Sequence, residues 1–227
     1  MEASPHGWYH PLFEEEVYIP IQPYLSYYKH YQLHSYWRCP AWQHYWKSAF
    51  VIFSQMDMRI EYDKATGVVT KDSFRYIGLD EGVPPKEIDG RGIPKPYHGV
   101  VVGQINQYHT IWSESRNKDL WVEIVSPPNF AEKGIEIITA EFPIRWPRPM
   151  VSACRFNNAV TEISRGEPIG IVRFKNFKNS NDSFSLKRKE ASDRMKIKSH
   201  NLAKVKDFLP GKSWEVVERK CPFFKSR

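Results

Sequence analysis

Apolar runs of strand length, each ended by Pro or Gly, fill the sequence from about residue 49 to residue 174. Residues 49–53 are all apolar, which is typical of a strand buried on both faces. Further strands are predicted over residues 100–111, 120–125, 135–140, 149–157 and 168–174. Short strands punctuated in this way indicate a mainly β protein, an antiparallel β-sandwich or barrel of the jelly-roll or β-clip kind.

Other patterns lie within this β region or just before it. Residues 42–46 fit a short helix, and residues 56–62 alternate apolar with polar side chains before a turn at 64–67. The alternation predicts a hairpin with 68–70 that has one solvent-facing side. The Pro- and Gly-rich stretch 82–99 is predicted to be a long loop, and loops of that length are often functional.

The first 40 residues differ from the β region because they are rich in Tyr, His and Pro. Prolines spaced this closely do not allow a long helix, so we expect an extended arm. Its aromatic side chains suit either packing over the chain's own β domain or contact with a partner or a second copy. The candidate interface residues are Tyr24, Tyr27, Tyr28, Tyr31 and Trp37.

The last part of the chain, residues 176–227, is basic, and apolar residues at helical spacing predict an amphipathic helix over 186–208. The β domain then corresponds to residues 41–175. The chain carries a formal charge of +7, but residues 175–227 hold 15 Lys and Arg against 6 Asp and Glu, and residues 1–174 hold 18 against 20. The positive charge therefore belongs to the C-terminal segment. It can be a solvated helix face, or it can bind nucleic acid or an acidic protein through Lys187, Arg188, Lys189, Arg194 and Lys198.

A metal centre is an alternative source of function. Two imidazoles and a carboxylate on strands of a β-barrel can hold iron with open positions for substrate, and His98, His109 and Glu114 supply these groups. The spacing lacks the His-x-Asp or His-x-His pair with which barrel oxygenases commonly begin their site. Histidines in ordinary packing or loop hydrogen bonds are the competing interpretation. A bound iron or zinc ion is expected only if this metal-centre alternative is correct.

Motifs of other enzyme classes are not found. The sequence has no Gly-x-x-x-x-Gly-Lys-Ser/Thr loop, no Gly-x-Ser-x-Gly elbow and no His-Glu-x-x-His, so no catalytic residue is assigned. Its three cysteines cannot all pair, and none stands in a Cys-x-x-Cys spacing, which favours a reducing compartment. Acidic residues 14–16 and the absence of a long apolar run predict a soluble protein of the cytoplasm, or of a virion, with no membrane contact.

Two resemblances bear on the fold. The segment around Arg165-Gly166-Glu167-Pro168-Ile169, about 30 residues in all, resembles the last strands of the β-clip fold of deoxyuridine triphosphatases. The substrate-gripping strand, phosphate loop and Gly-rich arm of those enzymes have no match, so their chemistry does not carry over. Taken whole, the chain resembles a family of β-sandwich proteins from tailed phages, especially marine ones, and some bacteria. The segments that carry this resemblance are residues 39–42 with the run 49–53, residues 112–128, the 165–169 turn, and residues 220–223.

The phage-type resemblance implies a β-sandwich and a viral context, and it supplies no established activity. Our leading hypothesis is a non-enzymatic structural or interaction protein that acts through its aromatic arm and basic helix, with a protein partner or a homo-oligomer. The alternatives are a cupin-like metal-dependent oxygenase that uses His98 and His109, and a nucleic-acid-binding accessory protein. No cofactor is expected under the leading hypothesis.

Overall fold

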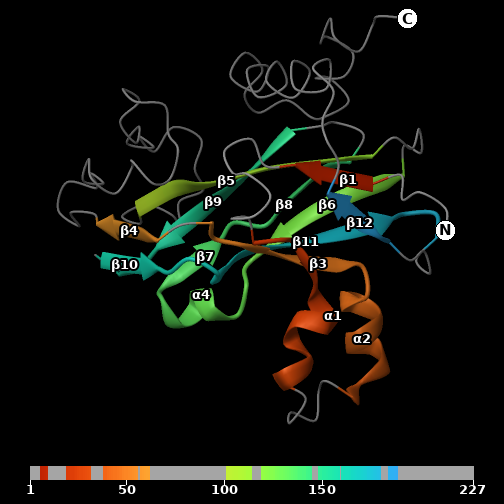
Figure 1. The fold of residues 1–227 in the computed structure, drawn as a ribbon, viewed down its shortest axis with the longest axis horizontal. Coiled ribbons are helices and arrows are strands. Elements are labelled where there is room, and N and C mark those ends of the chain that lie inside the picture. Colours follow the sequence, from red (N-terminus) through yellow and green to blue (C-terminus); the bar gives the residue numbers. More distant parts are fainter. Residues whose placement is uncertain are drawn as a thin grey trace, which may run out of the picture.

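Antiparallel β-sheets make up most of the described part of the chain in the computed structural model (Figure 1). The structure describes residues 6–9, 19–31, 38–55, 57–61, 101–113, 119–144, 148–158, 160–179 and 184–188. The strands are β1 (His6–Tyr9), β2 (Gln22–Pro23), β3 (Ala49–Phe53), β4 (Met58–Glu61), β5 (Val101–Ser113), β6 (Leu120–Val125), β7 (Ile135–Ile137), β8 (Ala140–Pro143), β9 (Arg148–Phe156), β10 (Val160–Ile163), β11 (Pro168–Asn176) and β12 (Leu186–Arg188). The helices are α1 (Tyr24–Tyr27), the 3₁₀ turn η2 (Tyr28–Tyr31), α2 (Pro40–Trp46) and α4 (Asn129–Glu132).

The strands form two five-stranded sheets and one two-stranded sheet. The first, here called the β5 sheet, has the order β12-β1-β5-β9-β7, and the second, the β3 sheet, has the order β2-β3-β11-β6-β8. Strands β4 and β10 pair with each other. Every described pairing is antiparallel except that of β1 with β12. The prediction of a mainly β chain with antiparallel sheets is therefore confirmed.

One hydrophobic cluster takes side chains from both five-stranded sheets. Ile52 and Val172 of the β3 sheet belong to the same cluster as Ile111 and Phe156 of the β5 sheet, and all four are almost fully buried. Side chains alternate between the two faces of a strand, so the intervening residues of β3 and β11 point the other way. The main core therefore contacts only one face of the β3 sheet.

The opposite face of the β3 sheet is covered in part by the N-terminal helices. A second cluster joins Val51 and Phe53 of β3 to Tyr24 of α1, with Trp46 of α2 packed against them. This arrangement explains why residues 49–53 are apolar throughout, because each face of β3 lies against its own cluster. The predicted strand buried on both faces is confirmed here, and so is the predicted short helix at 42–46, which α2 contains.

Several predicted elements differ from those observed. Leu186–Arg188 is strand β12 and not the first turn of a helix, because it pairs with β1 at the margin of the β5 sheet. Strand β4 pairs with β10, a pairing that the sequence pattern does not predict, while residues 68–70 lie outside the described residues. The run 135–140 is divided between two sheets, β7 pairing with β9 and β8 with β6. Residues 82–99 and 189–208 also lie outside the described part of the chain.

Candidate interaction face

Four charged side chains share the face of the β3 sheet that points away from the main core. Strand β11 contributes Arg173 and Lys175, β6 contributes Glu123, and β8 contributes Glu141. The strand register places Arg173 opposite Glu123, and Glu123 opposite Glu141. The charges therefore form a row across three neighbouring strands, here called the ion network.

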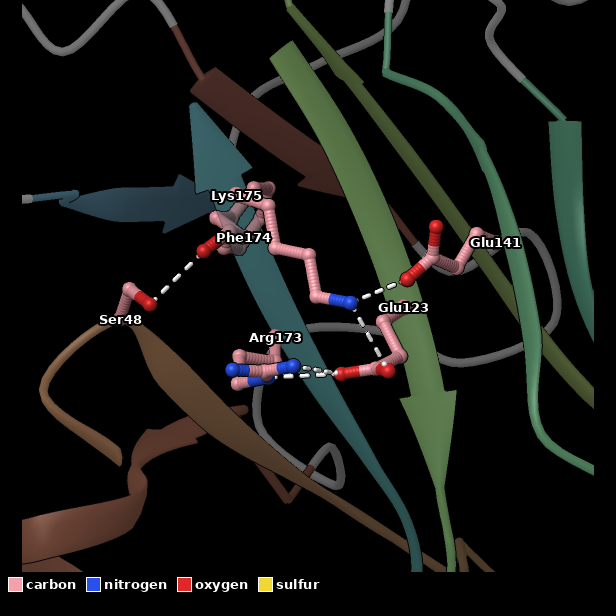
Figure 2. A network of polar contacts seen from close by, with 6 residues as sticks. All are labelled: Ser48, Glu123, Glu141, Arg173, Phe174 and Lys175. Atoms are coloured by element: carbon pink, nitrogen blue, oxygen red, sulfur yellow. Dashed lines mark hydrogen bonds and ion pairs between the residues drawn. The ribbon is translucent and has the colours of Figure 1, made fainter. Parts of the chain in front are cut away.

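Each basic side chain of the network contacts at least one carboxylate (Figure 2). The Arg173 guanidinium donates a hydrogen bond from Nε to Glu123 Oε2 at 2.7 Å, and its Nη2 also lies against that oxygen. The Lys175 amine donates to Glu123 Oε1 at 2.9 Å and to Glu141 Oε1. Lys175 thus bridges two carboxylates on different strands.

The position of Lys175 relieves the electrostatic repulsion between two carboxylates of the sheet. Like charges directly opposite each other on neighbouring strands repel, and Glu123 and Glu141 are such a pair. Burial by itself would lower the pKa of the Lys175 amine, but hydrogen bonds to Glu141 and Glu123 outweigh that effect and raise its pKa above the usual 10.5. The amine is therefore firmly protonated at neutral pH, and it neutralises the repulsion between the carboxylates.

The network is partly withdrawn from solvent, although it lies on the sheet face that points away from the main core. The exposed fraction of the side chain is 10% for Glu123 and 13% for Arg173, against 36% for Glu141. The ring of Tyr45, from α2, covers the Arg173 guanidinium with its centroid 3.7 Å from Cζ. Tyr45 is itself 43% exposed. The helix thus covers one end of the row and leaves Glu141, at the other end, open to water.

Aromatic side chains also lie beside Lys175. Trp121 is the cross-strand neighbour of Lys175 and shares its face, and its ring meets that of Phe177 edge-on with centroids 5.9 Å apart. Phe177 is 62% exposed. Next to it, Lys178 Nζ lies 2.8 Å from Asp119 Oδ2. We call the surface formed by Tyr45, the ion network, Trp121 and Phe177 the aromatic-flanked face.

No family model matches this sequence, and no curated protein shows significant similarity to it.

Chemically, the aromatic-flanked face is suited to binding more than to catalysis. All four of its charged groups are engaged in ion pairs with one another, and their formal charges cancel. The raised pKa of Lys175 makes its amine a poor nucleophile, because a neutral amine is required for attack. Exposed Tyr45 and Phe177, half-buried Trp121 and a shielded Arg form the kind of composition that is enriched at protein–protein contacts.

The predicted metal site is only partly within the described chain. His109 lies on β5 within an irregularity between Asn106 and Thr110, and its side chain is fully buried. His98 and Glu114 lie outside the described residues. Among the side chains that are described, no group of three His, Cys, Asp or Glu is arranged to hold a metal ion. Metal binding through these three residues stays a prediction.

The predicted basic contacts begin on strand β12. Lys187 is exposed there, and Arg188 is partly buried. Lys189, Arg194 and Lys198 lie outside the described residues. Within the described ranges, no helix is both long and apolar enough to cross a membrane.

The predicted aromatic contacts divide into two groups. Tyr24 and Tyr28 are buried within this chain, and the Tyr24 ring stacks on Trp46 with centroids 4.3 Å apart. Tyr27 is partly buried and meets Phe53 edge-on. These three side chains pack on the chain's own β3 sheet, as the intramolecular interpretation of the arm expects. The side chain of Tyr31 and all of Trp37 lie outside what the structure describes.

Sequence reasoning missed the ion network, but a signal for it was present. Glu123 interrupts the otherwise apolar strand at 120–125, and Arg173 and Lys175 alternate with apolar residues near the end of 168–176. A charge at every second position of a strand marks one face. What the sequence does not show is that these strands are neighbours, which is the condition for opposite charges to meet.

Proposed function

We propose that this chain is a non-enzymatic β-sandwich protein of the type found in tailed phages, and that it works through protein contacts in a homo-oligomer. The observation that carries the proposal is the aromatic-flanked face. Tyr45 and Phe177 are two of the three large hydrophobic side chains that are exposed in the described chain, and both border the ion network. Such residues commonly provide most of the binding energy of an interface.

The proposed sandwich rests on the distribution of the core. Two facing sheets must share one set of inward side chains, and the main cluster draws on strands of both five-stranded sheets. The face of the β3 sheet that bears the ion network is then its outer face. A jelly-roll or β-clip order of strands is part of this proposal.

The distribution of charge on the aromatic-flanked face is complementary to that of a second copy of the chain. On the aromatic-flanked face, the positive groups belong to β11 and the negative groups to β6 and β8. Two copies related by a two-fold axis can set the β11 side of one against the β8 side of the other, so that unlike charges meet twice. Glu141, the most exposed member of the network, would then gain a second cation.

Sedimentation velocity over a range of protein concentrations tests this proposal. We expect a dimer or larger oligomer for the natural sequence, and at least about a tenfold weaker association for Phe177→Ala and Tyr45→Ala, since interface anchors typically contribute more than about 1.4 kcal/mol. Val160→Ala is the matched control, because Val160 is also an exposed hydrophobic residue, at 47%, but lies on β10. A monomer at every concentration, or equal weakening by the control, would reject this face.

A nucleic-acid-binding accessory role is a second candidate, favoured by the exposed Lys187 on β12 at the start of the basic segment. Cations that neutralise phosphates give retention on DNA that falls steeply with salt. Lys187→Gln should lower the salt dependence by about one counterion, whereas Lys178→Gln should not. Lys178 is the control because it is exposed but already paired with Asp119. Absence of retention on duplex DNA at low salt excludes this role.

A further inference from the structure

A continuous series of ring contacts joins the aromatic-flanked face to the N-terminal aromatic arm. It begins where the Tyr45 ring covers the Arg173 guanidinium, with 3.7 Å between the ring centroid and Cζ. Tyr45 meets Trp46 edge-on with centroids 4.9 Å apart, and Trp46 stacks on Tyr24 of α1 at 4.3 Å. The Tyr24 ring in turn lies 4.6 Å from that of Tyr28. One end of the series is exposed on the face, and the other is buried against β3.

Helices α1 and α2 depend on these contacts. They lie side by side next to β3 (Figure 1), where the arm covers Val51 and Phe53. They have four and seven residues, and neither has a side chain that caps its N-terminus. Helices this short are not stable by themselves in water. None of the seven residues of α2, all of which the structure describes, is buried. Packing of aromatic rings therefore contributes much of what holds both helices on the sheet, and we expect them to dock and undock together.

Arg173 is the fixed member of the series. Its Nε donates a hydrogen bond to Glu123 Oε2 at 2.7 Å, and its Nη2 lies against the same oxygen. The carboxylate on β6 thus holds the guanidinium in place while its face is presented to Tyr45. A cation–π contact is weaker when water surrounds it and stronger when the pair is desolvated. Tyr45 is 43% exposed, so in a single chain this contact is partly hydrated.

We infer that Tyr45 and Arg173 form a latch, through which a second copy bound to the aromatic-flanked face holds the aromatic arm on the β3 sheet. A copy that covers Tyr45 removes water from the cation–π contact and strengthens it. The docked position of α2 is then favoured, and α1 follows through the stack of Tyr24 on Trp46. This inference rests on the proposed homo-oligomer and names what association regulates. Assembly would control whether the apolar side chains of β3 under the arm stay covered.

Hydrogen exchange of the full chain, followed by mass spectrometry, tests the latch. The backbone amides of residues 24–28 report undocking of the arm, because protected amides exchange when their segment opens. The chain is measured at a concentration where sedimentation shows the oligomer and at one where it shows the monomer. We expect about fivefold slower exchange of these amides in the oligomer, the difference between a hydrated and a desolvated cation–π contact. Helix α4 is the internal control, because it is equally short but is not part of the aromatic-flanked face. Its exchange should be the same at both concentrations.

Two variants separate the latch from a general effect of association. Tyr45→Leu keeps an apolar side chain but has no ring to cover Arg173, so residues 24–28 of the monomer should exchange about threefold faster than in the natural sequence. Phe177 is also exposed on this face, but its ring meets Trp121 of β6. Phe177→Ala should therefore leave the exchange of residues 24–28 in the monomer unchanged. Urea unfolding shows that both variants are folded.

The possible results also distinguish the latch from the proposed homo-oligomer. Unchanged exchange of residues 24–28 in monomeric Tyr45→Leu, or an equal acceleration by Phe177→Ala, would overturn the latch. An oligomer in which these amides exchange at the monomer rate, or in which α4 slows equally, refutes control of the arm by association and leaves the homo-oligomer intact. A monomer at every concentration refutes both. Slower exchange in the oligomer that is specific to residues 24–28, with faster exchange in Tyr45→Leu, supports the latch.

Discussion

Replacing Lys175 by Met should destabilise the fold far more than replacing Lys178 by Met. Both lysines make ion pairs, and Met keeps most of the length of the side chain while removing its charge. Lys175 bridges the facing carboxylates of Glu123 and Glu141, with its own side chain 22% exposed. Lys178 pairs with Asp119 alone, and its side chain is 79% exposed. The comparison therefore separates a partly buried bridge from a surface ion pair.

The size of this destabilisation follows from the two carboxylates that Lys175 bridges. Its loss removes hydrogen bonds to charged groups, which are worth about 1.5–3 kcal/mol when the partner is left buried. It also leaves like charges opposed across β6 and β8, which costs about 0.2–1 kcal/mol. Arg173 still neutralises Glu123, and Glu141 can turn toward water, so both costs are reduced. We expect a net loss of about 1.5–2.5 kcal/mol in the free energy of unfolding.

Urea unfolding at neutral pH, followed by tryptophan fluorescence, measures this loss. Lys175→Met should lower the unfolding midpoint with little change in the slope, whereas Lys178→Met should leave the midpoint within error. The double variant Lys175→Met/Glu141→Gln should recover part of the loss, because it removes the repulsion between the carboxylates. If Lys175→Met is no worse than Lys178→Met, or if the second substitution recovers nothing, then the repulsion argument is wrong.

Three further predictions follow from single sites. Gly134→Ala should lower the thermal midpoint more than Gly166→Ala: both glycines have positive φ, at +66° and +88°, but only at Gly134 would a Cβ lie 2.6 Å from the Asn158 side chain. The folded-state pKa of Lys175 is raised, so the charged amine stabilises the fold fully below about pH 10.5, and this stabilisation is lost as the pH rises through the folded-state pKa. Above pH 10.5 the unfolding midpoint should therefore fall less in Lys175→Met than in the natural sequence. Elemental mass spectrometry should find about one iron or zinc per chain, lost in His98→Ala/His109→Ala, if the oxygenase alternative holds, whereas no metal in either sample would reject it.

The strands that could be predicted are those whose own residues are apolar enough to indicate burial. Residues 49–53 and 120–125 are apolar enough to identify as strands without knowledge of their neighbours, and both were placed correctly. Partner strands could not be read in this way. β4 pairs with β10 across about a hundred residues of sequence, and the residues of a four-residue strand do not indicate which other strand it will pair with. The error at Leu186–Arg188 has the same origin, because its pairing with β1 overrides the helical spacing of the residues that follow.

The same limitation applies to the function of the aromatic arm. Its composition fits an interface and a core equally well, because Tyr and Trp bury large apolar areas in either setting. Tyr24 and Tyr28 pack against Val51 and Phe53 of β3. Val51 and Phe53 point away from the main core, so they would face water if the two tyrosines did not cover them. Tyr24 and Tyr28 are therefore occupied by the chain's own sheet and are not available to a partner. In the proposed homo-oligomer, contacts would instead use aromatic residues that are exposed in the described chain, and Tyr45, on the helix that follows the arm, is one of them.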